Sequence, residues 1–113
     1  MSKVVGVKND QDKPNVAAIP KEAIWKMGLA LGYGAKKYGN NNYRNGMLIS
    51  RQLGAAVRHI YQFLDGEPQD LESGNCHLGH ALASLAMACY TLENCPDMDD
   101  RFEGDLEKHK ELK

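Results

Sequence analysis

The residues best suited to chemistry gather in one stretch of the sequence, from position 50 to position 91. They carry guanidinium, imidazole and carboxylate groups, which bind phosphates, exchange protons or hold metal ions. The pattern predicts a helix, an acidic turn and a second helix, so that these groups lie close together. In chain order they are Arg51, Arg58, His59, Glu67, Asp70, Glu72, His77 and His80.

Arg51 and Arg58 form the first candidate site, for the phosphates of a ligand. On a helix they stack along one edge, where two planar guanidinium groups could span a diphosphate. The opposite side is predicted to be the packing face and gathers Leu53, Ala56, Val57, Ile60 and Leu64. The alternative is that both arginines lie on a solvated face. Nearby cations that could join the site are Lys36, Lys37 and Arg44.

Three histidines form the second candidate site. His77 and His80 are three positions apart, so both can face one point at the start of a helix, with His59 on the helix before. A carboxylate from the turn could complete a metal shell or fix a tautomer. The alternative is that these histidines cap or pack their helices. Because no third ligand is certain, a transition metal is not predicted.

The acidic turn from Gly66 to Gly74 is the third candidate site. Glu67, Asp70 and Glu72 are candidate ligands for Mg²⁺, which prefers carboxylate oxygens. The alternative is helix capping, because acids are favoured just before a helix N-terminus. Aromatic rings that could stack on a nucleotide base are Tyr38, Tyr43 and Tyr61.

The elements that would position these groups are all helical. A first helix should begin at Pro20 and end at Gly39, and a second should be capped by Ser50 and end at Gly66. A third should run from near Asn75 to about Glu93. The sequence thus predicts one all-α domain, a bundle of three main helices with a short C-terminal helix. Its parts are an arm (1–18), a helical core (19–94) and a peripheral segment (95–113).

The third helix is apolar almost all round between positions 81 and 92, which predicts burial by neighbouring helices or by a second subunit. We therefore expect a homo-oligomer. Cys89 is expected to be a small core residue. A narrow stripe of small or polar residues should allow a close approach, and it comprises His77, Ala81, Ser84, Ala88 and Thr91.

Composition narrows the class of protein. The chain has 113 residues and a net charge of −1, so no overall basic field favours a nucleic-acid polymer or a membrane surface. No apolar run approaches the roughly 20 residues that span a bilayer, and the N-terminus does not resemble a secretory signal. Three cysteines without CxxC spacing suit reduced thiols. A cytoplasmic location is expected.

Four segments together resemble a known family: KPNVAAIPKEAI, YGAKKYGNNNYRNG, SRQLGAAVRHIYQFLDGE and DLESGNCHLGHALASL. They are similar to small, mostly phage proteins described as the dATP/dGTP diphosphohydrolase N-terminal domain, distantly related to the MazG-type all-α nucleoside-triphosphate pyrophosphatases. The resemblance covers residues 8–93 and implies a location in an infected bacterial host. The positions that it implies for nucleotide handling are Lys36, Lys37, Tyr38, Arg51, Arg58, His59, Asp70, Ser73, His77 and His80.

The chain lacks the metal-binding acids of the related hydrolases, and this difference determines which function we expect. MazG-type enzymes hold Mg²⁺ with E-x-x-E on one helix and E-x-x-D on the next, whereas this chain has Arg58-His59 and His77-x-x-His80 there. We therefore expect a protein that holds a phosphorylated nucleotide in an oligomer-interface pocket without cleaving it. It could be a sponge for a host immune signal such as an ADP-ribose derivative or a cyclic nucleotide.

Two other functions stay open from the sequence. The first is a Mg²⁺-dependent dATP/dGTP pyrophosphohydrolase that uses Asp70, Glu72 and Glu67, with His77 or His80 as the base. The second is an interaction module whose apolar third helix docks on a partner. No metal or other cofactor is certain, although Mg²⁺ would serve the enzyme.

Overall fold

The structure of the chain is a computed structural model that describes residues 6–9 and 11–103. It contains three α-helices, which are α1 (Lys21–Tyr38), α2 (Ile49–Leu64) and α3 (His77–Asn94). Short 3-10 helices flank them, namely η1 (Val16–Ala18), η2 (Asn42–Asn45) and η3 (Pro96–Met98). No β-strand occurs in the described ranges, so the predicted all-α class is confirmed. The expected C-terminal helix lies mostly outside the described residues.

Proline and glycine set the helix ends as predicted. Pro20 is the N-cap of α1, and Gly39 ends the helix with a φ of 94°, a conformation that side chains with a Cβ rarely adopt. Gly66, just after α2, has a φ of 104° for the same reason. The local sequence therefore determines where α1 and α2 stop.

The start of α2 differs from the prediction, because Ser50 is not its cap. Leu48 is the N-cap and offers no capping side chain. Asp100 instead accepts a hydrogen bond from the Ser50 backbone N–H at 2.9 Å and another from its hydroxyl at 2.5 Å. A carboxylate distant in sequence thus satisfies an N–H that the helix leaves free.

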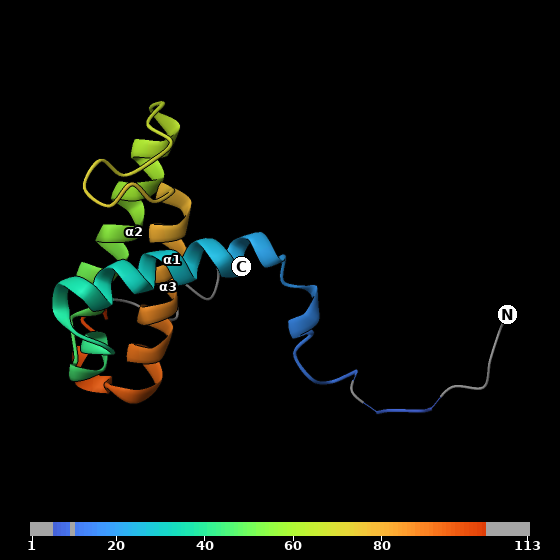
Figure 1. Cartoon of the computed structure of the whole chain (residues 1–113). Coiled ribbons are helices and arrows are strands. Elements are labelled where there is room, and N and C mark those ends of the chain that lie inside the picture. Colours follow the sequence, from blue (N-terminus) through green and yellow to red (C-terminus); the bar gives the residue numbers. More distant parts are fainter. Residues whose placement is uncertain (1–5, 10, 104–113) are drawn as a thin grey trace, which may run out of the picture.

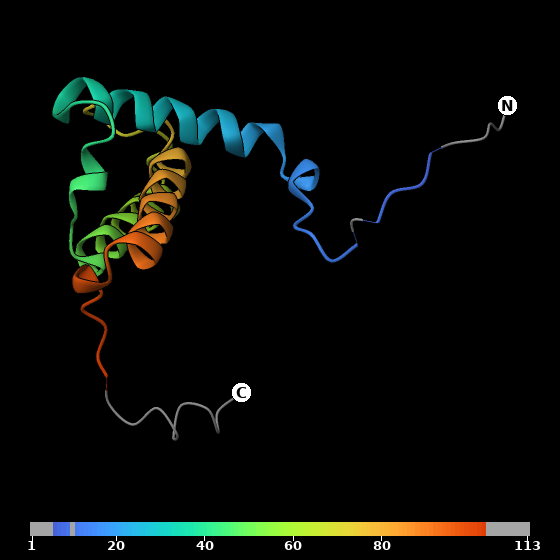
Figure 2. The same cartoon turned by 90° about the horizontal axis from the view of Figure 1, so that it is seen from below.

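Helices α2 and α3 run side by side, and α1 lies across α3 with its N-terminal end extending beyond the pair (Figures 1 and 2). The crossing is close at Gly79 of α3. A Cβ at this position would lie 2.5 Å from the backbone oxygen of Lys26 in α1. Glycine here allows the two backbones to approach, which sets where α1 crosses the start of α3.

The buried face of α2 is not the one that the sequence predicted. Ile49, Gln52 and Ala56 are buried, whereas Leu53, Val57, Ile60 and Leu64 are between 38% and 70% exposed. Only Ala56 of the predicted packing face is therefore buried. Helix α2 is thus rotated about its axis relative to the predicted orientation. The half-buried His59 therefore lies on the side that meets α3.

Helix α3 buries one face and exposes another. All five residues of its predicted close-approach stripe are buried, from His77 to Thr91. Leu78, Leu85 and Leu92 are between 39% and 45% exposed, and Cys89 is exposed, so its prediction as a core residue is wrong. In the single chain the helix is not covered all round. No helix in the described ranges is long and apolar enough to cross a membrane.

Candidate functional site

A cavity of about 520 Å³ opens between the end of α1, the loop after it, the middle of α2 and the start of α3. Its volume lies within the roughly 300–1,000 Å³ that is common for small-molecule sites. The predicted residues that line it are Lys37, Tyr38, Tyr43, Arg58, His59, Asp70, Glu72 and His80. One cavity thus joins cations, aromatic rings, imidazoles and carboxylates.

Other predicted residues lie outside the cavity wall, and the structure adds some that sequence analysis missed. Lys36, Arg44, Arg51, Glu67, Ser73 and His77 do not line it. Additional lining residues include Tyr33, Asn40, Asn41, Asn42, Ser84 and Met87. The run of asparagines after Gly39 was a signal for polar groups near a ligand. The roles of all these residues in binding stay predictions.

Arg58 contributes a cation to the cavity that forms no ion pair with any residue the structure describes. Its guanidinium lies over Gly54, where Nη1 is 3.5 Å from the place of an added Cβ. Arg51 does not reach the cavity, so the predicted pair of arginines brings only one guanidinium to it.

Arg44 is held away from the cavity by two aromatic rings. Its guanidinium carbon lies 5.7 Å from the centre of Tyr43 and 5.1 Å from the centre of Tyr90. Such cation–π contacts are attractive. Arg44 therefore supports Tyr43, which does line the cavity.

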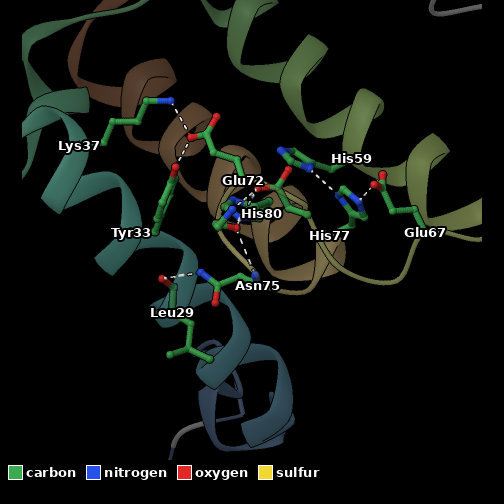
Figure 3. Close-up of polar contacts among 11 residues, drawn as sticks. Leu29, Tyr33, Lys37, His59, Glu67, Glu72, Asn75, His77 and His80 are labelled. Atoms are coloured by element: carbon green, nitrogen blue, oxygen red, sulfur yellow. Dashed lines mark hydrogen bonds and ion pairs between the residues drawn. The ribbon is translucent and has the colours of Figure 1, made fainter.

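Lys37 and Glu72 form an ion pair at the cavity wall. Lys37 Nζ lies 2.8 Å from Glu72 Oε2, and the Tyr33 hydroxyl donates to the same oxygen (Figure 3). The hydrogen bonds from Lys37 and Tyr33 hold the pKa of Glu72 below its ordinary value. Glu72 thus balances the charge of Lys37 and ties the turn to α1.

The turn before α3 is built from its own side chains. Asp70 Oδ2 accepts a hydrogen bond of 2.8 Å from the Ser73 N–H, and Ser73 Oγ accepts one of 3.1 Å from the Asn75 N–H. Gly74 adopts a φ of 75°. Burial acts to raise the pKa of Asp70, but the hydrogen bonds from Ser73 outweigh it, and the pKa lies below its ordinary value. Asp70 is therefore ionised at neutral pH.

The three histidines meet behind this turn (Figure 3). His59 Nδ1 lies 2.8 Å from His77 Nδ1, and His77 Nε2 lies 3.0 Å from Glu67 Oε2. The ring of His80 stacks on His59 with the centroids 4.7 Å apart, and its Nε2 is 2.7 Å from Ser73 Oγ. Burial lowers the pKa of both His59 and His80, which favours neutral imidazoles.

The three candidate ligands for Mg²⁺ do not converge. Glu67 contacts His77, Glu72 contacts Lys37, and Asp70 caps its own turn. Among the described residues, the metal-ligating atoms that lie within 4.8 Å of one another belong to His59, Asp70 and His77. This set does not fit an oxygen shell of the kind that Mg²⁺ prefers.

The family model described as "dATP/dGTP diphosphohydrolase, N-terminal" matches residues 4–101. The chain belongs to this family. A similar protein of Salmonella phage PMBT28, named dATP/dGTP diphosphohydrolase, is 33% identical over 98 residues, which cover 87% of this chain and 33% of that protein. The chain thus spans about a third of the length of the curated relative that it matches. No solved structure matches it.

Membership of the dATP/dGTP diphosphohydrolase N-terminal family confirms the resemblance seen in the sequence. In this member the cavity offers a guanidinium for phosphate, aromatic rings for a base and neutral imidazoles that can accept a proton. The D-L-E-S-G motif forms the turn before α3, in which Asp70 and Ser73 accept hydrogen bonds from backbone N–H groups. The cavity thus combines the kinds of side chain that bind phosphate and aromatic bases with imidazoles that accept protons.

Proposed function

We propose that this chain binds a purine deoxynucleoside triphosphate in the cavity and hydrolyses it to the monophosphate and diphosphate. The family and the name of the phage relative support this substrate and reaction. One observation carries the proposal: Arg58, an unpaired cation within the described structure, and His80, a half-buried imidazole, line the same cavity. The proposal gives the pyrophosphohydrolase function more weight than the sponge.

Cationic side chains of the cavity bind the phosphates of the nucleotide, and its aromatic side chains bind the base. Arg58 binds phosphate oxygens with paired N–H groups, and Lys37 adds a second cation when phosphate competes with Glu72. Tyr38 and Tyr43 stack on the base. The asparagines of the loop after α1 supply polar contacts.

His80 is the proposed general base. It takes a proton from water, the water oxygen attacks the α-phosphorus, and the bond from this phosphorus to the bridging oxygen breaks, so diphosphate leaves with that oxygen. Asp70 Oδ2, 3.9 Å from His80 Nε2, stabilises the imidazolium that forms. Arg58 offsets the charge that develops on the phosphate oxygens. His77 does not line the cavity, which favours His80 over His77 for this role.

Binding without cleavage is the second candidate function. The observation that favours it is that both described carboxylates lining the cavity, Asp70 and Glu72, already accept hydrogen bonds, and the Mg²⁺ ligands of related hydrolases are missing. A cavity dominated by cations and imidazoles would hold a nucleotide intact. Sequestration of a host immune signal, an ADP-ribose derivative or a cyclic nucleotide, would be the corresponding activity.

The chain is further proposed to act as a homo-oligomer in the cytoplasm of an infected bacterial host. Its exposed apolar side chains support self-association, because they follow one face of α2 from Leu53 to Leu64 and one face of α3 from Leu78 to Leu92. Large exposed apolar patches are typical of protein interfaces. The phage origin of the relative supports the location.

The two functions differ in the fate of the nucleotide. The protein is incubated with each of dATP, dGTP, dCTP, dTTP, ADP-ribose and cyclic mononucleotides and dinucleotides, with and without Mg²⁺. It is then denatured, and the nucleotides are separated by anion-exchange chromatography. Monophosphate and diphosphate from the purine nucleotides, lost in folded His80→Gln, support hydrolysis. Stoichiometric recovery of intact, bound nucleotide supports the sponge, and no binding to any nucleotide overturns both and favours an interaction module.

A further inference from the structure

The histidine cluster lies at the meeting point of three segments that are separate in the sequence. His59 comes from the middle of α2, Asp70 from the turn, and His77 from the first position of α3. One ligand atom of each lies within 4.8 Å of the others. Such convergence of two imidazoles and a carboxylate is a recurrent donor set for divalent transition metals.

The hydrogen bond of His77 fixes which of its nitrogens is free. A carboxylate can only accept a hydrogen bond, so Glu67, at 3.0 Å, holds a proton of His77 on Nε2 when the ring carries a single proton. The lone pair of His77 then lies on Nδ1, which faces His59 Nδ1 at 2.8 Å. Metal-ligating histidines commonly donate their other N–H to a carboxylate in this way.

Because His77 is buried, its Nδ1 needs a partner within the protein when no ion is bound. His77 is 0% exposed, so its Nδ1 has no water to bind. The described contact is satisfied only when His59 carries its proton on Nδ1, whereas a bound ion would accept the lone pairs of both rings. Two nitrogens on one tetrahedral zinc lie about 3.3 Å apart, as follows from bonds of about 2.0–2.1 Å. A small ring rotation would therefore convert the contact into a chelate.

The charges also suit a divalent ion. Metal-bound imidazoles carry no charge, so His59 and His77 would add none to the site. Asp70 supplies one negative charge beside the rings, and Glu67 supplies a second charge behind His77. Two carboxylates would balance a charge of +2 locally.

We propose that His59, Asp70 and His77 bind one divalent transition-metal ion of the Zn²⁺ class. Two of these three residues, His59 and Asp70, line the cavity, so the remaining coordination positions face it. Imidazole nitrogens favour such ions, whereas Mg²⁺ prefers oxygen ligands alone. The proposed hydrolase function is not required for this inference, because the ion can be measured without a nucleotide.

The test is a titration of the chelator-treated full chain with Zn²⁺, followed by calorimetry, and with Co²⁺, followed by its visible absorption. We expect one equivalent of ion, a higher Tm with Zn²⁺, and a Co²⁺ spectrum of nitrogen and oxygen ligands without thiolate bands. His59→Asn and Asp70→Asn should each weaken the affinity at least 100-fold. The amide oxygen that Asp70→Asn introduces can still accept the hydrogen bond from Ser73, which preserves the turn.

Matched controls separate this site from adventitious binding. His109→Ala removes the histidine that lies outside the described residues, and Cys76→Ser removes the thiol next to His77, so both should leave the affinity within 2-fold. Absence of saturable binding, or equal affinity in wild type and folded His59→Asn and Asp70→Asn, would overturn the site. Metal binding without nucleotide hydrolysis would overturn the proposed enzyme alone, and hydrolysis without metal binding would overturn the metal site alone.

Discussion

Glu67 Oε2 lies 3.0 Å from Nε2 of His77, a side chain that is fully buried at the start of α3. The contact joins the turn after α2 to the first residue of the next helix. Because the carboxylate accepts the proton of Nε2, it orients the ring and directs Nδ1 toward His59. The geometry of the histidine cluster therefore depends on an acid that does not line the cavity.

Replacement of Glu67 by glutamine tests this orienting contact. The amide oxygen can still accept the hydrogen bond, but the charge is lost, so the free energy of unfolding should fall by about 1 kcal/mol. Urea denaturation of the wild type and the variant measures the difference. Glu93→Gln changes an exposed acid of α3 and serves as the control. Equal stabilities of Glu67→Gln and Glu93→Gln would contradict the contact.

Gly79→Ala tests the close crossing of α1 and α3. The new Cβ would lie 2.5 Å from the Lys26 backbone oxygen, so one helix must shift, and we expect a loss of about 1–3 kcal/mol. Gly28→Ala in α1 is the matched control, because nothing lies within 4 Å of its Cβ position. It should stabilise the protein by about 0.5–1 kcal/mol. Thermal and urea unfolding should give opposite signs for the two variants.

The two arginines of α2 provide a matched pair for ligand binding. Arg58 lines the cavity and Arg51 does not. Arg58→Gln should weaken the binding of a non-hydrolysable α,β-methylene analogue of dGTP about 10–100-fold, as expected for the loss of charged hydrogen bonds. Arg51→Gln should change the affinity less than 2-fold. Similar losses in both variants, measured by calorimetry, would show that the phosphates bind along the outer edge of α2.

Asp100→Asn tests the carboxylate at the start of α2. The hydrogen bonds from the Ser50 hydroxyl and N–H hold the pKa of Asp100 below its ordinary 3.8. A carboxyl with a lowered pKa contributes stability that is complete above its unfolded pKa and is lost as the pH falls through the folded value. The variant should thus have a lower Tm than the wild type at pH 6, and the difference should shrink below pH about 4.

The control for Asp100 is Asp97→Asn in η3, which should keep the wild-type Tm at both pH values. A constant difference in Tm between Asp100→Asn and the wild type across this pH range would show that the effect does not come from the ionised carboxylate.

Val57→Glu tests self-association through the exposed apolar face of α2. Val57 is 47% exposed, so a charge there can be solvated in the single chain but not in an apolar interface. Light scattering should give a multiple of 12.5 kDa for the wild type and the mass of one chain for the variant. Gln62→Glu, on the polar side of the same helix, is the control. A wild-type protein with the mass of one chain would contradict the proposed homo-oligomer.

Local sequence determined the helices and their ends. Pro20, Gly39 and Gly66 act through their own backbone preferences, which need no tertiary partner, and the predicted bounds of α1 and α2 agree with the structure to within a residue or two. The D-L-E-S-G turn and the family membership are likewise carried by residues that are neighbours in the chain. These features could be predicted because each depends on short-range geometry.

The packing of α2 was decided only by the tertiary structure. Periodicity defines two faces of a helix, but which face meets α3 depends on where the backbones can approach, and Gln52 and His59 face inward while Leu53 and Val57 do not. That rotation also brings the edge of α2 that carries Arg58 to the cavity. Helical spacing placed both arginines on one edge, but it could not say how far along the helix the cavity extends.

The histidine cluster was likewise decided only by the tertiary structure. His59, Asp70 and His77 are separated along the chain, and their contact requires the angle between α2 and α3 together with the turn that Asp70 closes. The three acids of the turn share a short segment, yet its backbone directs Glu67, Asp70 and Glu72 to different partners. The sequence by itself therefore determined the donor types, and the tertiary structure decided which of them meet, because convergence depends on the relative positions of the elements.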